Sequence, residues 1–223
     1  MTDKPATKAG PRTAAKAKKP GAATATVHQF KITLDSSKPP IWRRIQLPSD
    51  ASFWDLHCAV NDAMGWEDAH LHAFQIGGPP NAVDIGIPDE NAMPWGEVTT
   101  LAGWEVPIAT HFKQVGDRCT YLYDFGDDWS HDVVLEEILP RAAGGKYPRC
   151  LAGARACPPE DCGGIYGYTQ LCKALTKPGK ADENIEELLE WIGPDFDPKA
   201  FDAGEVTFYS AKRRLKALRE SMR

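Results

Sequence analysis

Two runs of alternating residues, followed by one amphipathic pattern, constrain the fold of this chain more than any other feature. Apolar side chains alternate with polar ones over residues 27–34 and again over 41–47, which is typical of strands with one buried face. The segment 35–40 between them, Asp-Ser-Ser-Lys-Pro-Pro, predicts a turn. A helix over 53–64 and a third strand over 70–76 follow, so the chain is predicted to begin in the order β-β-α-β.

The predicted helix carries its own boundary signals. Ser52 fits the N-cap, and Asp55 stands three residues later, in the position of a capping box. Gly65 suits the left-handed conformation that ends many helices.

The second half predicts a hairpin, formed by strands at 119–125 and 129–138 with the short turn Gly126–Asp128 between them. The stretch 141–164 is rich in Gly and Pro and is expected to be a loop. Strands that come first, without a βαβ alternation, indicate an α+β fold with an antiparallel or mixed sheet. The segment 77–110 is irregular and predicts no particular element.

Three helices are expected after the loop, and we expect them to pack on the sheet. Apolar residues recur at helical spacing over 167–176, 183–192 and 206–222. The side chains predicted to contribute to the core are Trp42, Phe53, Leu56, Val60, Phe74, Tyr123, Phe125, Trp129 and Leu135.

Charge divides the chain into three parts. Its net charge is -5, but residues 1–26 carry six Lys or Arg against one Asp, and residues 212–223 carry six against one Glu. The remainder holds 14 basic and 29 acidic residues, a charge of -15. We therefore predict a disordered basic tail at 1–26, one domain at 27–205 and a basic amphipathic helix at 206–223. Because an acidic body repels phosphate, any nucleic-acid contact is expected through the two basic ends.

Hydropathy and cysteine content favour a cytoplasmic protein with no membrane association. No apolar stretch approaches the roughly 18 residues of a membrane span, and the first residues lack the apolar core of a secretory signal. The six cysteines are then better interpreted as thiols or metal ligands than as disulfides.

Three segments concentrate reactive side chains. The first places His70 and His72 on one strand face, where either can be a ligand or a hydrogen-bonded core residue. The second is the hairpin, which carries Asp124, Asp127, Asp128 and His131. These oxygen and nitrogen atoms can hold a metal, but aspartates also favour turns, and His131 shares its face with apolar neighbours.

The third segment holds Cys150, Cys157 and Cys162 within the Gly- and Pro-rich loop. The spacing between the last two fits zinc ligands, and His131, His70 or His72 would supply the fourth. The alternative interpretation is a tight loop with small buried thiols. We predict that hairpin 121–131 and loop 150–164 meet and form one site, since clustered polar groups can satisfy one another.

Long motifs in these segments resemble the plasmid pRiA4b ORF-3-like family. They are Lys-Pro-Pro-Ile-Trp-Arg-Arg at 38–44, Asp-Leu-His at 55–57, Ala-Met-Gly-Trp at 63–66, His-Leu-His-Ala-Phe at 70–74, Tyr-Asp-Phe-Gly-Asp-Asp-Trp at 123–129, His131, and Cys-Pro-Pro-Glu-Asp-Cys-Gly-Gly at 157–164. The resemblance runs from about Val27 to Asp202. It implies an α+β fold and an association with plasmids and insertion sequences, and it carries no settled activity.

Two functions follow from these patterns. The first is a non-enzymatic binding or accessory protein of mobile elements, with a nucleic acid or a protein as partner, because no P-loop, dinucleotide-binding, hydrolase-elbow or zincin motif is present. The alternative is a metal-dependent hydrolase, acting for example on phosphodiesters. Its candidate catalytic residues are Asp124, Asp127, Asp128, His131, Glu160 and Asp161.

Overall fold

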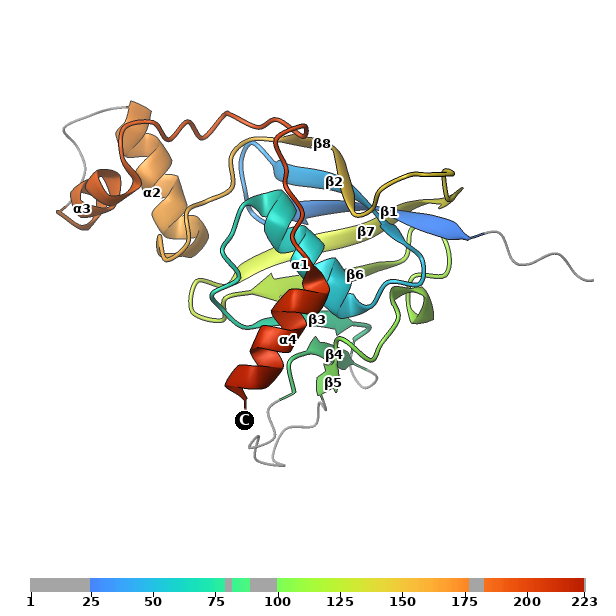
Figure 1. Ribbon diagram of the computed structural model, residues 1–223. Helices are drawn as coiled ribbons and strands as arrows, with labels where there is room; N and C mark the ends of the chain where they lie inside the picture. Colours follow the sequence, from blue (N-terminus) through green and yellow to red (C-terminus); the bar gives the residue numbers. More distant parts are fainter. Residues whose placement is uncertain (1–24, 79–81, 89–99, 177–182, 223) are drawn as a thin grey trace, which may run out of the picture.

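The protein forms one mixed sheet with a helix across one of its faces (Figure 1). The computed structural model describes residues 25–78, 82–88, 100–176 and 183–222. Within these ranges eight strands pair in the order β5-β4-β3-β6-β7-β1-β2-β8. Their bounds are β1 Thr26–Leu34, β2 Ile41–Pro48, β3 His72–Ile76, β4 Val83–Gly86, β5 Thr100–Ala102, β6 Arg118–Tyr123, β7 Trp129–Pro140 and β8 Arg149–Ala154. The pair β4–β5 is parallel and the others are antiparallel, as the predicted mixed α+β fold requires.

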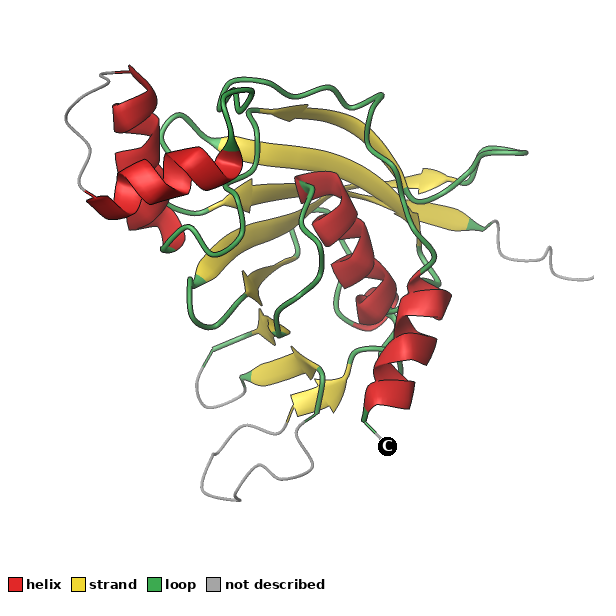
Figure 2. Cartoon of the chain, turned by 60° about the vertical axis from the view of Figure 1, so that its left-hand side comes forward, coloured by secondary structure: helices red, strands yellow, loops and turns green. Residues whose placement is uncertain are grey.

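The helices lie in two places (Figure 2). Helix α1 (Phe53–Met64) crosses the sheet, and α4 (Ala211–Ser221) lies against α1. Helices α2 (Gly164–Thr176) and α3 (Glu183–Ile192) pair with each other at one end of the sheet. A short 3₁₀ turn, η1, spans Ile108–Thr110. None of the helices in the described residues is long and apolar enough to cross a membrane.

Helix α1 is positioned by the signals at its two ends. The Ser52 side chain accepts a hydrogen bond from the Asp55 backbone N–H, and the Asp55 carboxylate accepts from the Ser52 N–H, so the predicted capping box is present. Gly65 ends the helix at φ 99°, in the left-handed region that glycine adopts without strain. The order β-β-α-β is therefore confirmed.

The core lies between the sheet and α1. Inward residues of β1, β2, β6 and β7 meet Phe53, Leu56 and Val60 of the helix, while α2 contributes Tyr168 and Leu171. Of the predicted core residues, Phe53, Leu56, Val60, Phe74, Tyr123, Trp129 and Leu135 are buried. Trp42 is only half-buried, because on β2 it alternates with the inward Ile41 and Arg43.

Several expectations need correction. Phe125 is 55% exposed instead of buried, because β6 ends at Tyr123 and the positive φ of Asp124 breaks the alternation. The loop expected over 141–164 contains β8, which pairs with β2. The last helix begins at Ala211 and not at 206, since Ser210 caps it.

Two expectations concern less regular parts of the chain. The irregular segment 77–110 contributes the short strands β4 and β5. Residues 1–24 of the predicted disordered tail lie outside the described residues, whereas Ala25 is described and Thr26 already belongs to β1.

Candidate functional site

The turn between β6 and β7 is built by aspartates. Asp124 and Asp128 adopt φ values of 56° and 57°, a conformation in which aspartate is tolerated better than most residues. One carboxylate oxygen of Asp124, Oδ1, accepts the Gly126 N–H at 2.9 Å. The other oxygen of this carboxylate, Oδ2, faces the neighbouring segment that carries His70.

The loop 157–164 folds against this turn, as predicted from the density of polar residues. Gly163 donates its N–H to Asp127 Oδ2 at 3.1 Å. Gly164, at φ 63°, packs so closely on the Asp127 carbonyl that a Cβ atom would clash with it. Glycine at 164 therefore fixes the distance between the turn and the loop.

A histidine and two carboxylates converge where the turn and the loop meet. The His70 ring has Nδ1 at 3.7 Å from Asp124 Oδ2 and Nε2 at 3.4 Å from Asp161 Oδ1. These three residues form the one group of three or more potential ligands, within the described ranges, whose ligand atoms lie within 4.8 Å of one another. The Asp124 side chain is 10% exposed and that of Asp161 is 71% exposed, so the cluster opens to solvent on one side.

Tyr123, the last residue of β6, connects this cluster to the sheet by hydrogen bonds. Its hydroxyl accepts the N–H groups of Ala69 and His70 at 3.1 and 3.4 Å, and it donates to Glu160 at 2.5 Å. Burial and the Glu160 carboxylate raise the pKa of Tyr123. The phenol therefore stays protonated and holds both the segment that carries His70 and the loop that carries Asp161.

A second cluster of histidine and carboxylate lies in the protein interior. His57 Nε2 is 2.7 Å from Asp68 Oδ1, and its Nδ1 is 2.8 Å from the Tyr121 hydroxyl, to which Asn61 also donates. The His72 ring stacks on His57 with centroids 3.4 Å apart. Burial lowers the pKa of His57 to about 3 and that of His72 well below its usual value. Both rings are therefore neutral at pH 7.

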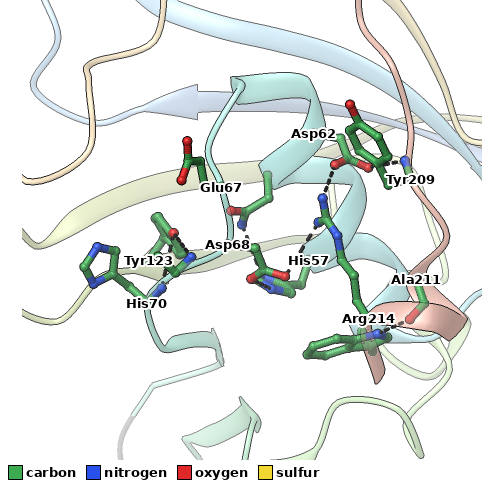
Figure 3. Close-up of polar contacts among 12 residues, drawn as sticks. His57, Asp62, Glu67, Asp68, His70, Tyr123, Tyr209, Ala211 and Arg214 are labelled. Atoms are coloured by element: carbon green, nitrogen blue, oxygen red, sulfur yellow. Dashed lines mark hydrogen bonds and ion pairs between the residues drawn. The ribbon is translucent and has the colours of Figure 1, made fainter. Parts of the chain in front are cut away.

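Helix α4 contacts this interior cluster through the side chain of Arg214. Figure 3 shows Asp68 between His57 and Arg214, with His70 farther along the segment that carries Asp68 and Tyr123 of β6 beside His70. The Arg214 guanidinium is 2.5 Å from Asp62 and 3.6 Å from Asp68. Burial raises the pKa of both carboxyl groups, and Arg214 opposes that rise.

The cysteines and histidines predicted to bind zinc lie in different elements of the fold and differ in burial. Cys150 lies on β8, and Cys157 and Cys162 lie in the loop, but their sulfur atoms do not form a three-ligand group with one another or with a histidine within the described residues. Burial raises the pKa of all three thiols, that of Cys162 to about 12. His131 is fully buried beside Trp66, and His72 stacks on His57, so only His70 among the predicted histidines meets carboxylates at a site open to solvent.

The predicted acidic residues also separate. The His70 ring faces Asp124 and Asp161, and the Tyr123 hydroxyl donates to Glu160. Asp127 binds the loop backbone, and Asp128 is exposed. Sequence reasoning missed His57, Asp68 and Arg214, although His57 stands in the Asp-Leu-His motif. Arg214 gave no signal beyond the charge of the last helix.

A hollow lies beside Trp66 and Glu67. Its volume is about 1160 Å³, and it runs between the end of α1, the Cys157 loop and the segment 200–214. Arg43 is buried at its floor, where its guanidinium donates to the carbonyl of Ala63 and lies 3.8 Å from the centre of the Phe201 ring. This arrangement holds the C-terminal segment against the domain.

The fold and site together define a class: a single mixed sheet crossed by one helix, with a histidine–carboxylate cluster beside the central hairpin. The chain belongs to the plasmid pRiA4b ORF-3-like protein family, whose model matches residues 26–205. It is 36% identical to the uncharacterized protein y4hQ of Sinorhizobium fredii (strain NBRC 101917 / NGR234), over 82% of this chain and 89% of that one. It is also similar to the crystal structure of MM3350, a protein of unknown function from Methanosarcina mazei Go1. The TM-score is 0.72 and the identity 37%, over 83% of this chain and 99% of that chain.

Proposed function

We propose that this protein is a non-enzymatic accessory protein whose domain binds a divalent metal ion at His70, Asp124 and Asp161. The convergence of these three side chains at an opening to solvent carries the proposal. An imidazole nitrogen with two carboxylate oxygens is a donor set used for Zn²⁺ and Mn²⁺. The surrounding structure supports this role, because Tyr123 and Gly164 fix the two segments that supply the ligands.

The site needs only a small rearrangement to coordinate one ion. Two ligand atoms bound tetrahedrally to zinc at about 2.1 Å lie about 3.4 Å apart, and one ligand atom from each of the three residues lies within 4.8 Å of the others in this cluster. The two carboxylates face opposite nitrogens of the His70 ring, so one of them must move toward the other's nitrogen. The exposed Asp161 can do so by side-chain rotation, whereas Asp124 is held by Gly126.

Isothermal titration calorimetry of the untagged full chain with Zn²⁺ and Mn²⁺ tests the proposal. We expect one site per chain, and we expect His70→Ala or Asp124→Asn to weaken binding at least tenfold. Asp50→Asn is the matched control, since Asp50 is an exposed aspartate outside the cluster.

A second set of variants tests the zinc site predicted from the cysteines. If Cys157→Ser or Cys162→Ser abolishes binding while His70→Ala does not, the metal site lies at the cysteines and the proposal is wrong. Equal affinity in the parent protein and the His70→Ala variant would also contradict it.

Metal-assisted hydrolysis is a second candidate, favoured by one observation. Three protein ligands leave a coordination position for water, as in catalytic metal sites, and the Glu160 carboxylate lies on the hydroxyl of Tyr123 beside the cluster. Hydrolysis of bis(p-nitrophenyl) phosphate in saturating Mn²⁺ distinguishes the two functions. A rate that His70→Ala and Glu160→Gln both lower at least tenfold supports the enzyme, whereas a rate unchanged by both variants leaves metal binding as the function.

A further inference from the structure

The face of the sheet opposite α1 carries a row of basic and aromatic side chains. On β2, Ile41, Arg43 and Ile45 point toward α1, so Trp42 and Arg44 point to the other face. In the strand register, Lys31 of β1 lies opposite Arg44, and Arg149 of β8 lies opposite Gln46. Side chains of β1 and β8 therefore join the same row. We call this row, with the connection that precedes β8 at its edge, the basic face; it is formed by Lys31, Trp42, Arg44, Gln46 and Arg149 of the strands and by Arg141 and Tyr147 of the connection.

Cations flank an aromatic ring at each end of the basic face. The Trp42 ring has Lys31 Nζ at 5.4 Å and the Arg44 guanidinium at 5.3 Å from its centroid. The Tyr147 ring has Arg149 at 5.1 Å and Arg141 at 5.6 Å. Both rings are half-buried, which leaves part of each accessible to a flat ligand.

Gln46 connects the two ends. Its Oε1 accepts from Arg149 at 2.9 and 2.7 Å, and its Nε2 donates to Gln29. Arg149 is therefore held in place above the sheet while its side chain stays exposed. The register of β2 and β8 thus sets the position of Arg149 relative to Trp42.

The charge of the basic face contrasts with that of the whole domain. Arg44 is neutralised by Glu136, but Lys31, Arg141 and Arg149 form no ion pair with another described residue. In the sequence, six Lys or Arg stand among residues 1–24, ahead of Ala25. The Ala25 carbonyl accepts the N–H of Arg141 at 2.8 Å, which places the start of the described chain beside Arg141.

We propose that the basic face binds single-stranded nucleic acid, with bases stacked on Trp42 and Tyr147 and phosphates held by the neighbouring cations. Lys31, Arg141 and Arg149 match a phosphate backbone in charge, and aromatic rings interleaved with cations on a sheet are how single strands are held without sequence preference. A duplex hides its bases and would meet the cations alone. The proposal places the contact on a face of the domain, whereas the charge pattern of the sequence predicted it at the two basic ends, and it is independent of the metal site.

Fluorescence anisotropy with a labelled oligothymidylate of about 16 nucleotides tests this on the full chain. We expect Arg141→Gln with Arg149→Gln to weaken binding at least tenfold. The same pair should reduce the slope of log affinity against log salt by about 1.4, or about 0.7 for each lost phosphate contact. The matched control is Lys212→Gln with Lys216→Gln, which removes the same charge from the exposed side of α4, where an effect below threefold is expected.

Stacking is tested separately with Tyr147→Leu and Trp42→Leu, whose folding is checked by thermal melting. Each should weaken binding at least fivefold with an unchanged salt slope, because a base loses its aromatic partner and no phosphate contact is lost. Having both variants keeps the test decisive should one of them fail to fold. The proposal is overturned if the oligonucleotide does not bind at about 50 mM salt, if the control pair weakens binding as much as the arginine pair, or if duplex DNA binds as tightly.

Discussion

Two clusters of histidine and carboxylate lie on either side of one short segment, and they differ chiefly in their access to water. His57 and Asp68 are in the interior, where every ring atom of His57 is covered by protein. His70 meets Asp124 and Asp161 at the surface, with Asp161 largely in solvent. Asp68 belongs to the first cluster and His70 to the second, and of the two clusters the second reaches solvent.

The comparison shows what burial does to a histidine. In the interior, desolvation keeps His57 neutral, and Tyr121, Asn61 and Asp68 use its hydrogen-bonding capacity. Such a ring adds specificity to the core and cannot exchange a ligand. At the surface, His70 faces carboxylates that are not otherwise saturated, which is what a metal site requires.

Removing Trp66 should have the largest effect, because this side chain packs on Tyr123 and His131 below the surface cluster. Trp66→Ala should lower the free energy of unfolding by about 3–5 kcal/mol, measured by urea denaturation. Phe125→Ala is the control: Phe125 is exposed on the neighbouring turn, and its truncation should cost under about 0.5 kcal/mol. Similar losses in the two variants would show that the inward face of this hairpin is misassigned.

The buried histidines should make stability depend on pH. Burial lowers the pKa of His57 to about 3 and of His131 to about 4, whereas the unfolded value is about 6.5. Below pH 6.5 the unfolded chain binds protons that the folded chain does not, so the free energy of unfolding falls as the pH drops toward 4. Each histidine contributes about 1.4 kcal/mol per pH unit in that window.

His131→Phe tests this dependence, because phenylalanine suits the contact with Trp66 and cannot titrate. Urea denaturation between pH 6.5 and 4 should give the variant a shallower slope than the parent protein. Equal slopes would mean that His131 is already protonated in the folded chain, against the account given above.

Tyr121→Phe should have a smaller effect, confined to the interior cluster. The hydroxyl is the partner of His57 Nδ1 and of Asn61, and its loss leaves both buried without it. The expected cost is about 1–3 kcal/mol in the free energy of unfolding, with metal affinity changed less than twofold. A large loss of metal affinity would show that the two clusters act as one.

Asp161→Asn should have the smallest effect on stability and a large effect on metal binding. Because its side chain is 71% exposed, the free energy of unfolding should change by less than about 0.5 kcal/mol. In excess Zn²⁺ the parent protein should melt at a higher temperature, and the variant should lose most of that increase. A variant that keeps the full increase would remove Asp161 from the site.

The strands and first helix could be predicted from the sequence because their signals are local. Alternation identified β1 and β2, and Ser52, Asp55 and Gly65 defined α1. Strand β8 was missed because its residues are small and its pairing with β2 is a long-range interaction. Phe125 was misplaced because alternation could not show that Asp124 takes a positive φ.

The candidate site could be predicted only in its parts. The hairpin and the loop were expected to meet, and Asp127 with Gly163 joins them. The choice of His70 from the three candidate histidines depends on depth in the fold, which residue spacing does not encode. The cysteine spacing resembled a zinc motif, yet Cys150, Cys157 and Cys162 do not form a group of three converging ligands within the described residues, and spacing along the chain does not encode this.

Anomalous diffraction from crystals grown with Zn²⁺ tests the metal site most directly, because it locates the ion without reference to affinity or activity. The account predicts a peak about 2.0–2.2 Å from one His70 nitrogen and from one oxygen each of Asp124 and Asp161. A peak at Cys150, Cys157 or Cys162 with none at His70, or data at the zinc edge that contain no peak on the protein, would contradict it.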